Sequence, residues 1–285
     1  MSASEIPKQQ ILERLGELPS LPSVYHRARE AMDDPNGSVE TLAQIIGSDP
    51  AMASRLLRVA NSALYGLPAK VDSVWRALTI IGMGETRSLI LSTAVVTAFR
   101  DMPLGAVSMR SFWEHSIACG IAARTLARRM SLDNPERLYL VGLLHDIGRL
   151  CLFILEPAAM STVLQAHRER QGQLHEIERQ IFSTDHAEIG AALLARWSIP
   201  PAYCTAAQAH HDVMSPESTT VETALTHVAD IIVNSLRIGT SGSRWVPVLD
   251  DTAWRMTRLA PSDLPDIVET TIGTTRDVTS AFLEQ

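Results

Sequence analysis

The stretch that decides the fold is Gly142-Leu143-Leu144-His145-Asp146-Ile147-Gly148-Arg149. It places His145 and Asp146 side by side in a segment that is otherwise apolar and helical in pattern. If they were buried without partners, each of these polar side chains would cost about 1–3 kcal/mol in lost hydration. Neighbouring helical residues project about 100° apart, so the two side chains are predicted to flank a site. Gly148 allows a second backbone or a ligand to come close.

Two more polar residues on predicted apolar helices extend this pattern. His115 lies on an earlier helix and Asp230 on a later one. Together with His145 and Asp146 they would form a site of two imidazoles and two carboxylates. Such mixed nitrogen and oxygen donors suit Fe, Mn, Co, Ni or Zn better than Ca²⁺. Four protein ligands on a six-coordinate metal leave positions for water and phosphate oxygens, as metal-assisted hydrolysis requires.

Seven further histidines either extend this pattern or lie outside it. His186, at a predicted helix start, and the pair His210-His211 could bind a second metal ion or a phosphate group. Taken alone, His186 could also be an ordinary helix-start residue. The pair His210-His211 could also be an exposed helix end. The remaining four histidines are predicted to be hydrogen-bonded core residues or exposed residues: His26, His167, His175 and His227.

Composition limits the class of protein. The chain has 285 residues, of which 46% are apolar and 20% charged, so it can bury the core of one large domain or two modest ones. Its 25 basic and 32 acidic residues give a net charge of −7, which disfavours a broad nucleic-acid-binding surface. Three cysteines, Cys119, Cys151 and Cys204, lie far apart and are expected to be reduced packing residues.

The sequence predicts a cytoplasmic location. Residues 1–10 lack the basic-then-apolar pattern of a signal peptide. No uninterrupted apolar run approaches the roughly 20 residues that span a bilayer. A cytoplasmic protein without a membrane contact is therefore expected.

Helix signals dominate, and they predict an all-α fold. Ser38, Asp49, Ser73 and Asp185 each precede a segment with helical apolar spacing, as N-cap residues do. No segment shows sustained alternation with hairpin turns. Composition breaks suggest three parts: an N-terminal helical bundle at 1–105, a central helical domain at 106–238 and a C-terminal helical extension at 239–285.

The C-terminal extension carries a set of apolar residues at spacings that suit a buried face. They could pack back onto the central domain or form the contact of a homodimer. The residues are Trp254, Met256, Leu259, Leu264 and Ile267.

The histidine and aspartate motifs, together with several N-terminal stretches, resemble the HDOD (HD-related output domain) family of bacterial signalling proteins. The resemblance covers roughly residues 14–232 and follows the family's motif order. Its central motifs are Trp113-Glu114-His115, the stretch 142–148, the stretch 185–190, Trp197-Ser198-Ile199-Pro200 and His210-His211. The N-terminal third agrees in the stretches 18–22, 48–51, 56–62 and 77–82. The resemblance implies an all-helical fold in which an N-terminal bundle packs on an HD-like helical domain.

The resemblance also carries expectations about the site. HDOD domains resemble HD and HD-GYP phosphohydrolases, the latter being cyclic-di-GMP phosphodiesterases. By this resemblance His115, His145, Asp146 and Asp230 match the HD metal ligands. The extra histidines of the HD-GYP type are matched by His186, His210 and His211.

Two departures from the HD-GYP pattern bear on catalysis. No Gly-Tyr-Pro follows His210-His211, where the chain reads Asp212-Val213-Met214. Arg149 stands where HD-GYP proteins carry a lysine, and its planar guanidinium does not reproduce the geometry of a compact ammonium.

Two functions remain open. HDOD domains are generally regarded as non-catalytic, so the resemblance favours a regulatory module that binds a signalling protein or a small phosphate-containing ligand. The alternative is a metal-dependent phosphohydrolase that acts on a phosphodiester or nucleotide, including a cyclic dinucleotide. In that case Arg149 would neutralise phosphate charge as a catalytic residue.

Overall fold

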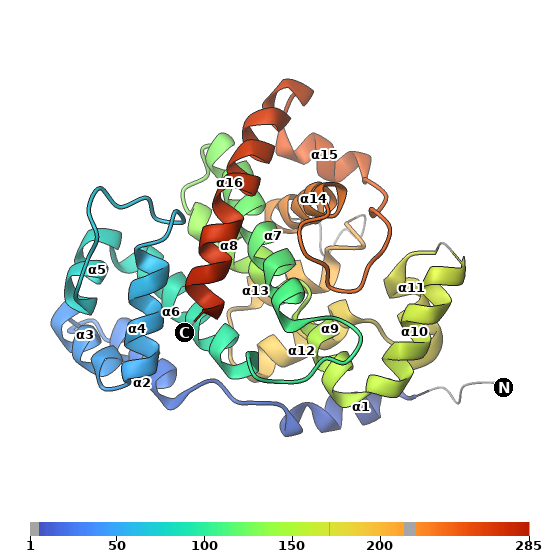
Figure 1. Ribbon diagram of the computed structural model, residues 1–285, viewed down its shortest axis with the longest axis horizontal. Helices are drawn as coiled ribbons and strands as arrows, with labels where there is room; N and C mark the ends of the chain where they lie inside the picture. The colour runs from blue at the N-terminus through green and yellow to red at the C-terminus, as the bar shows by residue number, and fades with distance from the viewer. Residues whose placement is uncertain (1–5, 171, 214–219, 285) are drawn as a thin grey trace. The chain divides into compact units, whose positions relative to one another are not determined.

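The structure is a computed structural model that describes residues 6–170, 172–213 and 220–284 (Figure 1). Within these ranges the chain forms α-helices and short 3₁₀ helices and contains no strand, which confirms the predicted all-α class. In chain order the helices are α1 (Lys8–Arg14), η1 (Leu15–Glu17), α2 (Ser23–Asp33), α3 (Val39–Gly47), α4 (Pro50–Ala60), α5 (Val74–Ile81), α6 (Met83–Phe99), α7 (Met109–Arg129), α8 (Pro135–Leu144), α9 (Ile147–Leu155), α10 (Pro157–Arg170), α11 (Leu174–Phe182), α12 (His186–Arg196), α13 (Pro201–Ala209), α14 (Val221–Leu236), α15 (Asp251–Thr257), η2 (Pro261–Asp263) and α16 (Leu264–Leu283).

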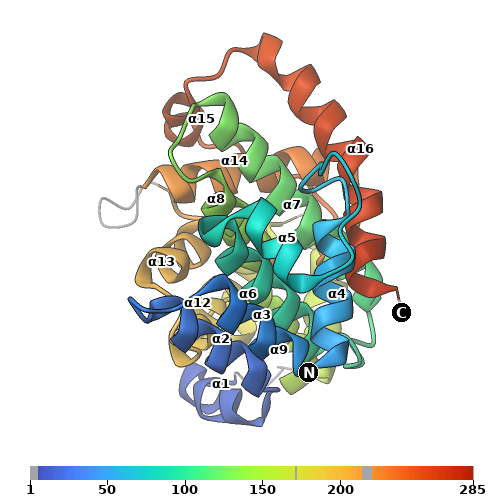
Figure 2. The ribbon, with the colours of Figure 1, turned by 90° about the vertical axis from the view of Figure 1, so that its left-hand side faces the viewer.

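The helices fall into two compact units. The first contains Met1–Leu18 and Met102–Ile272, and the second contains Pro19–Asp101 and Gly273–Gln285. In the second unit α2 packs against α3 and α6, and α3 packs against α4 and α5 (Figure 2). The division into parts at 105 and 238 stays a prediction, while the compact units divide the chain after Leu18, Asp101 and Ile272.

The predicted N-cap residues start their helices. The side chains of Ser38, Asp49, Ser73 and Asp185 each accept a hydrogen bond from a backbone N–H two or three residues further on. They begin α3, α4, α5 and α12. Each such bond satisfies one of the backbone donors that a helix start leaves without an intrahelical partner.

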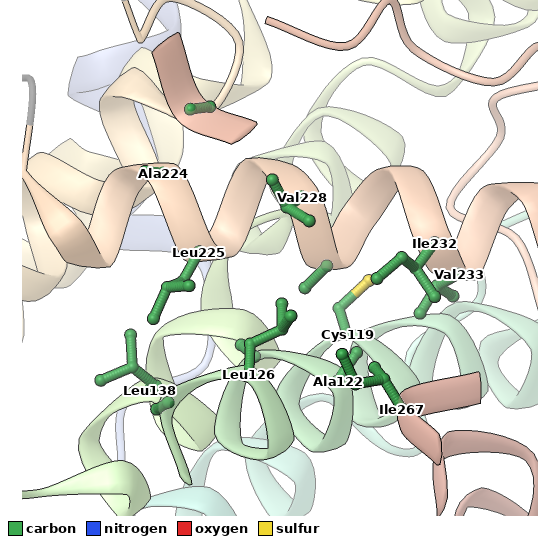
Figure 3. Close-up of a cluster of buried hydrophobic side chains, with 14 of the residues drawn as sticks. Cys119, Ala122, Leu126, Leu138, Ala224, Leu225, Val228, Ile232, Val233 and Ile267 are labelled. Carbon is green, nitrogen blue, oxygen red and sulfur yellow. The ribbon is translucent and has the colours of Figure 1, made fainter. Parts of the chain in front are cut away.

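The core of the first unit lies where α7 crosses α8 and α14, which lie side by side in Figure 1. Figure 3 shows Cys119, Ala122 and Leu126 of α7 directed toward the buried face of α14. Helices α7 and α8 approach closely because glycines stand at the crossing. A Cβ on Gly120 would lie 2.6 Å from the Tyr139 carbonyl oxygen, and one on Gly142 would lie 2.6 Å from the Cys119 carbonyl oxygen.

The C-terminal apolar residues pack back onto this core. Ile267 is 1% exposed and belongs to the buried cluster, as Figure 3 shows. Four more partly buried side chains pack against the same cluster: Trp254, Met256, Leu259 and Leu264. The structure thus shows the packing-back alternative for this segment.

The prediction from the sequence that His145 and Asp146 lie on a helix is wrong. Helix α8 ends at Leu144 and α9 begins at Ile147, so the pair forms the turn between them. Asp146 has φ −98° and ψ 10°, which is outside helical geometry.

One apolar stretch, Pro135–Leu155, is long and apolar enough to cross a membrane. It includes α8, the turn and α9. Because 94% of its most apolar window is buried within the fold, its apolar surface is already covered by protein. This is the pattern of helices at the centre of a domain.

Gly148 allows backbone contact rather than ligand contact. A Cβ at this position would lie 1.9 Å from the His186 carbonyl oxygen and 2.3 Å from the Gly190 backbone nitrogen. The opposing Gly190 is also a glycine, so α9 and α12 touch backbone to backbone. This contact brings the first residue of α12, His186, beside Asp146.

The variant Gly148→Ala should therefore be strongly destabilised. Its methyl group meets backbone atoms that cannot rotate away, and overpacking of this kind costs about 3 kcal/mol. We expect the free energy of unfolding in urea to fall by that amount. The control is Gly273→Ala in α16, where a Cβ meets nothing within 4 Å and stability should rise by up to about 1 kcal/mol. Equal stability of Gly148→Ala and the wild type would refute the close contact.

Candidate metal centre

The seven residues proposed from the sequence come together in the first unit. They arise from separate segments: His115 from α7, His145 and Asp146 from the turn, His186 from α12, His210 and His211 from the end of α13, and Asp230 from α14. All are buried except His211, which is partly exposed. Two groups of four potential metal ligands can be distinguished within the cluster.

The first group contains His115, Cys119, His145 and Asp230. His115 Nε2 lies 3.1 Å from Asp230 Oδ1, and His145 Nε2 lies 3.5 Å from the same oxygen. Cys119 Sγ lies 3.6 Å from His115 Nε2 and 3.9 Å from Asp230 Oδ1. Cys119 packs in the hydrophobic core as expected, and its sulfur also lies among the donor atoms.

The second group contains Asp146, His186, His210 and His211. Asp146 Oδ1 lies 3.0 Å from His186 Nε2 and 3.7 Å from His210 Nε2. His211 Nε2 lies 3.0 Å from His186 Nε2. Asp146 connects the two groups, because its Oδ2 is 3.4 Å from His145 Nε2 and 3.7 Å from His115 Nε2.

Backbone carbonyl groups fix the orientation of two imidazoles. His145 Nδ1 lies 2.7 Å from the Gly142 carbonyl oxygen, and His210 Nδ1 lies 2.6 Å from the Ala207 carbonyl oxygen. A carbonyl oxygen can only accept, so Nδ1 carries the hydrogen and donates it in both rings. The Nε2 atoms are thereby directed into the cluster, as in metal-binding histidines that are held from behind.

Three buried polar atoms of the cluster make no well-formed hydrogen bond to the described residues. They are His115 Nδ1, His145 Nε2 and Asp146 Oδ1, and the last two have only the close approaches to charged neighbours given above. Buried polar atoms are almost always paired, so atoms of this kind point to a group that the protein chain does not itself supply. An imidazole nitrogen and a carboxylate oxygen directed at one place suit a cation. The donors present therefore fit a divalent transition metal.

The carboxylates make the cluster attract positive charge. Burial raises the pKa of Asp146, but Arg149 and His145 outweigh burial and hold this pKa well below its usual range. Burial lowers the pKa of His145, but Asp146 and Asp230 outweigh it and raise this pKa to about 10. The carboxylates therefore favour positive charge on His145.

Arg149 is enclosed within the second group. Its side chain is 4% exposed, and Nη1 lies 2.8 Å from Asp146 Oδ2 while Nη2 lies 2.8 Å from His186 Nε2. Its Nε donates to Glu178 Oε1 at 3.3 Å, and Nη1 also donates to Ser241. The guanidinium is thus neutralised by two buried carboxylates of the protein itself.

Among the described residues, a narrow hollow borders the cluster. The hollow that reaches it has a volume of about 10 Å³, which is about the space of one water molecule. Ser243 and Pro247, from the segment after α14, line this hollow together with Arg149 and His211. The arrangement can hold an ion but leaves little room for an organic phosphate.

Sequence reasoning missed Cys119, Glu178 and Ser241. Cys119 follows His115 by four residues, a spacing that places both on one face of a helix. Glu178 belongs to the same face as Leu174 and Ile177, and a carboxylate in a buried apolar face requires a partner. It accepts a hydrogen bond from the His186 backbone N–H at 3.0 Å and pairs with the His186 ring. Ser241 has no comparable signal, because only the path of its loop brings it to Arg149.

The other histidines have ordinary surroundings. His167 Nδ1 donates to the Gly172 carbonyl, and its Nε2 accepts from the Arg244 backbone N–H. His227 is bonded in the same way, donating to the His210 carbonyl and accepting from the Asp250 N–H. In a third arrangement, His175 stacks on His211 with ring centroids 4.3 Å apart. His26, in the second unit, packs edge-on against Tyr25.

Solved structures with this fold cover nearly the whole chain. An HDOD domain protein of unknown function from Geobacter sulfurreducens is 25% identical, with a TM-score of 0.78 over 97% of this chain and 98% of its own. A candidate phosphohydrolase from Shewanella amazonensis is 23% identical, with a TM-score of 0.79 over 95% of this chain and 97% of its own. The second likeness concerns the fold alone.

Sequence comparison gives the same family. An uncharacterized protein of Treponema pallidum is 26% identical over 208 residues, which are 71% of this chain and 39% of that protein. The chain thus matches well under half the length of this relative. The sequence pattern of the HDOD domain matches residues 18–213. With this match over more than half of its length, the chain belongs to the HDOD domain family.

Proposed function

We propose that the chain is a non-catalytic regulatory module of bacterial signal transduction that works in the cytoplasm by binding. The observation that carries this proposal is the position of Arg149. Its guanidinium lies 2.8 Å from both Asp146 and His186, two of the four donors of the second group. A fixed positive charge at this place opposes the binding of a second metal ion.

Hydrolysis of a phosphodiester needs more than a bound metal. It needs an open coordination position, a water molecule and room for the phosphate oxygens. A hollow of about 10 Å³, lined by Ser243 and Pro247, provides none of this space. A metal ion held by His115, His145, Asp146 and Asp230 would supply Lewis acidity, but this hollow is too small to admit a phosphodiester.

A second candidate function, a metal-dependent phosphohydrolase, is favoured by one observation. All seven predicted ligands converge, and the Nε2 atoms of His145 and His210 are directed inward by their Nδ1 hydrogen bonds. Movement of the segment after α14 would be needed before a phosphodiester could reach these atoms. The two functions therefore differ in whether the chain hydrolyses a phosphodiester.

Turnover decides between the two functions. We expect the purified chain, supplied with Mn²⁺ or Fe²⁺, to hydrolyse bis(p-nitrophenyl) phosphate and cyclic di-GMP no faster than the variant Asp146→Ala, because no substrate reaches the metal. The assay measures product release by absorbance and chromatography. Metal-dependent turnover that is lost in Asp146→Ala would establish the hydrolase instead.

We also propose a small phosphate-containing ligand as the molecule bound. The first unit has an open hollow of about 730 Å³, a volume typical of small-molecule sites. Its lining includes Arg168, Arg237 and Arg244 and, among the described residues, no carboxylate. Guanidinium groups bind phosphate oxygens in a bidentate manner, so three of them around one hollow suit an anion of this kind.

The hollow is linked to the metal centre through one loop. Trp245, with an indole Nε1 that has no hydrogen bond to the described residues, lies on its wall. The same loop carries Ser241, which accepts a hydrogen bond from Arg149. A ligand that moved this loop would therefore change a contact at the centre. A signalling protein or a second copy of the chain would be the alternative partner.

Binding of phosphate compounds checks this assignment. We expect pyrophosphate and GTP to bind the full chain in isothermal titration calorimetry, and the double variant Arg237→Ala/Arg244→Ala to bind about 100-fold more weakly, because each charged hydrogen bond contributes about 1.5–3 kcal/mol. Arg76→Ala, at an exposed arginine of the second unit, is the matched control. Equal affinity of both variants, or no heat of binding for the wild type, would contradict the assignment.

A further inference from the structure

We propose that Cys119 is a thiolate ligand of a bound Zn²⁺-class ion, in a four-ligand site with His115, His145 and Asp230. The HD pattern assigns no cysteine to its metal, so this residue is a property of the present chain. The proposal concerns which atoms hold the ion and stands whether or not the chain hydrolyses a phosphodiester.

Helix geometry places the sulfur at the site. Cys119 follows His115 by one turn of α7, so both side chains leave the same face of the helix. Figure 3 shows the sulfur of Cys119 directed toward α14, the helix that carries Asp230. Cys119 and His145 are both 0% exposed, and His115 and Asp230 are nearly as well buried.

Four of the six distances between the donor atoms are close to the edges of a tetrahedron around one ion. Zinc bonds of about 2.0–2.1 Å to nitrogen or oxygen and about 2.3 Å to sulfur give edges of about 3.3 Å between nitrogen and oxygen and about 3.6 Å to sulfur. The two nitrogen–oxygen edges measured are 3.1 Å and 3.5 Å. The two sulfur edges are 3.6 Å to His115 and 3.9 Å to Asp230. All donor atoms of the group lie within 4.8 Å of one another.

A second, independent observation points to a cation at this place. His145 Nε2 makes no hydrogen bond to the described residues, although the side chain is wholly buried. Its other ring nitrogen donates to Gly142, so Nε2 faces the group and can bind a metal once it gives up its proton. Cys119 does not satisfy His145 Nε2, because the contacts of its sulfur are those with His115 and Asp230 given above.

The donor set selects the metal. A sulfur with two imidazoles favours Zn²⁺ or Co²⁺ over the harder Mg²⁺, Ca²⁺ and Mn²⁺. As the metal–sulfur bond forms, the thiol loses its proton to solvent, and thiolate and carboxylate together neutralise the two charges of the ion. Four protein ligands fill a tetrahedral shell, which is the arrangement of structural zinc sites.

Asp146 is the competitor for the fourth position. Its Oδ2 lies 3.4 Å from His145 Nε2, close enough to replace the sulfur in the set that the HD pattern implies. The same oxygen lies 2.8 Å from Arg149, whose guanidinium already neutralises it. Cys119 has no such cationic partner and is the donor left for the metal.

Cobalt substitution separates the two ligand sets. The full chain is freed of metal with a chelator and titrated with Co²⁺ while its absorption is recorded. We expect one Co²⁺ per chain, a near-ultraviolet band of thiolate-to-cobalt charge transfer and the intense visible bands of tetrahedral Co²⁺. Cys119→Ser should lose the charge-transfer band and bind Zn²⁺ about 100-fold more weakly. Cys151→Ser, at a buried cysteine outside the cluster, should keep both properties.

The wild type alone can overturn the proposal, so the test does not depend on how the variants fold. Bound Co²⁺ without a charge-transfer band, a band that persists in Cys119→Ser, or a chain that binds no Co²⁺ would each refute it. X-ray absorption of the Zn²⁺-loaded wild type gives a second measurement, with one sulfur in the first shell expected and none contradicting it. None of these readouts uses turnover, so their failure is distinct from failure of the proposed function.

Discussion

The centre of this protein depends on the burial of one guanidinium among carboxylates. Arg149 of α9 contacts Asp146 in the turn before it, Glu178 of α11 and Ser241 of the loop after α14. A buried charge without partners is costly, whereas a fully paired one is tolerated. Three segments of the first unit are therefore held by a requirement for charge balance, and the histidines are arranged around it.

This arrangement bears on the proposed lack of catalysis. The predicted ligands converge in the first unit. Arg149 lies 2.8 Å from two donors of the second group, where its positive charge opposes the binding of a second cation. Ser243 and Pro247 line the narrow hollow beside it.

Local patterns were enough to predict much of the fold but only part of the site. The all-α class and the caps Ser38, Asp49 and Asp185 follow from neighbours in the chain, so the sequence contains them directly. The seven converging residues followed from polar side chains on predicted apolar helices and from the family resemblance. The turn at His145, the partner Glu178 and the loop contact of Ser241 depend on segments that meet only in three dimensions, and short-range patterns do not contain that information.

The wide separation of the donors along the chain has a consequence for folding. Cys119 and Asp230 are 111 residues apart, yet their side chains meet at the crossing of α7 and α14. Closing so long a loop costs chain entropy before any contact can repay it. An ion bound there would act as a cross-link, so metal supply in the cell would set how much of the chain reaches and keeps its folded form.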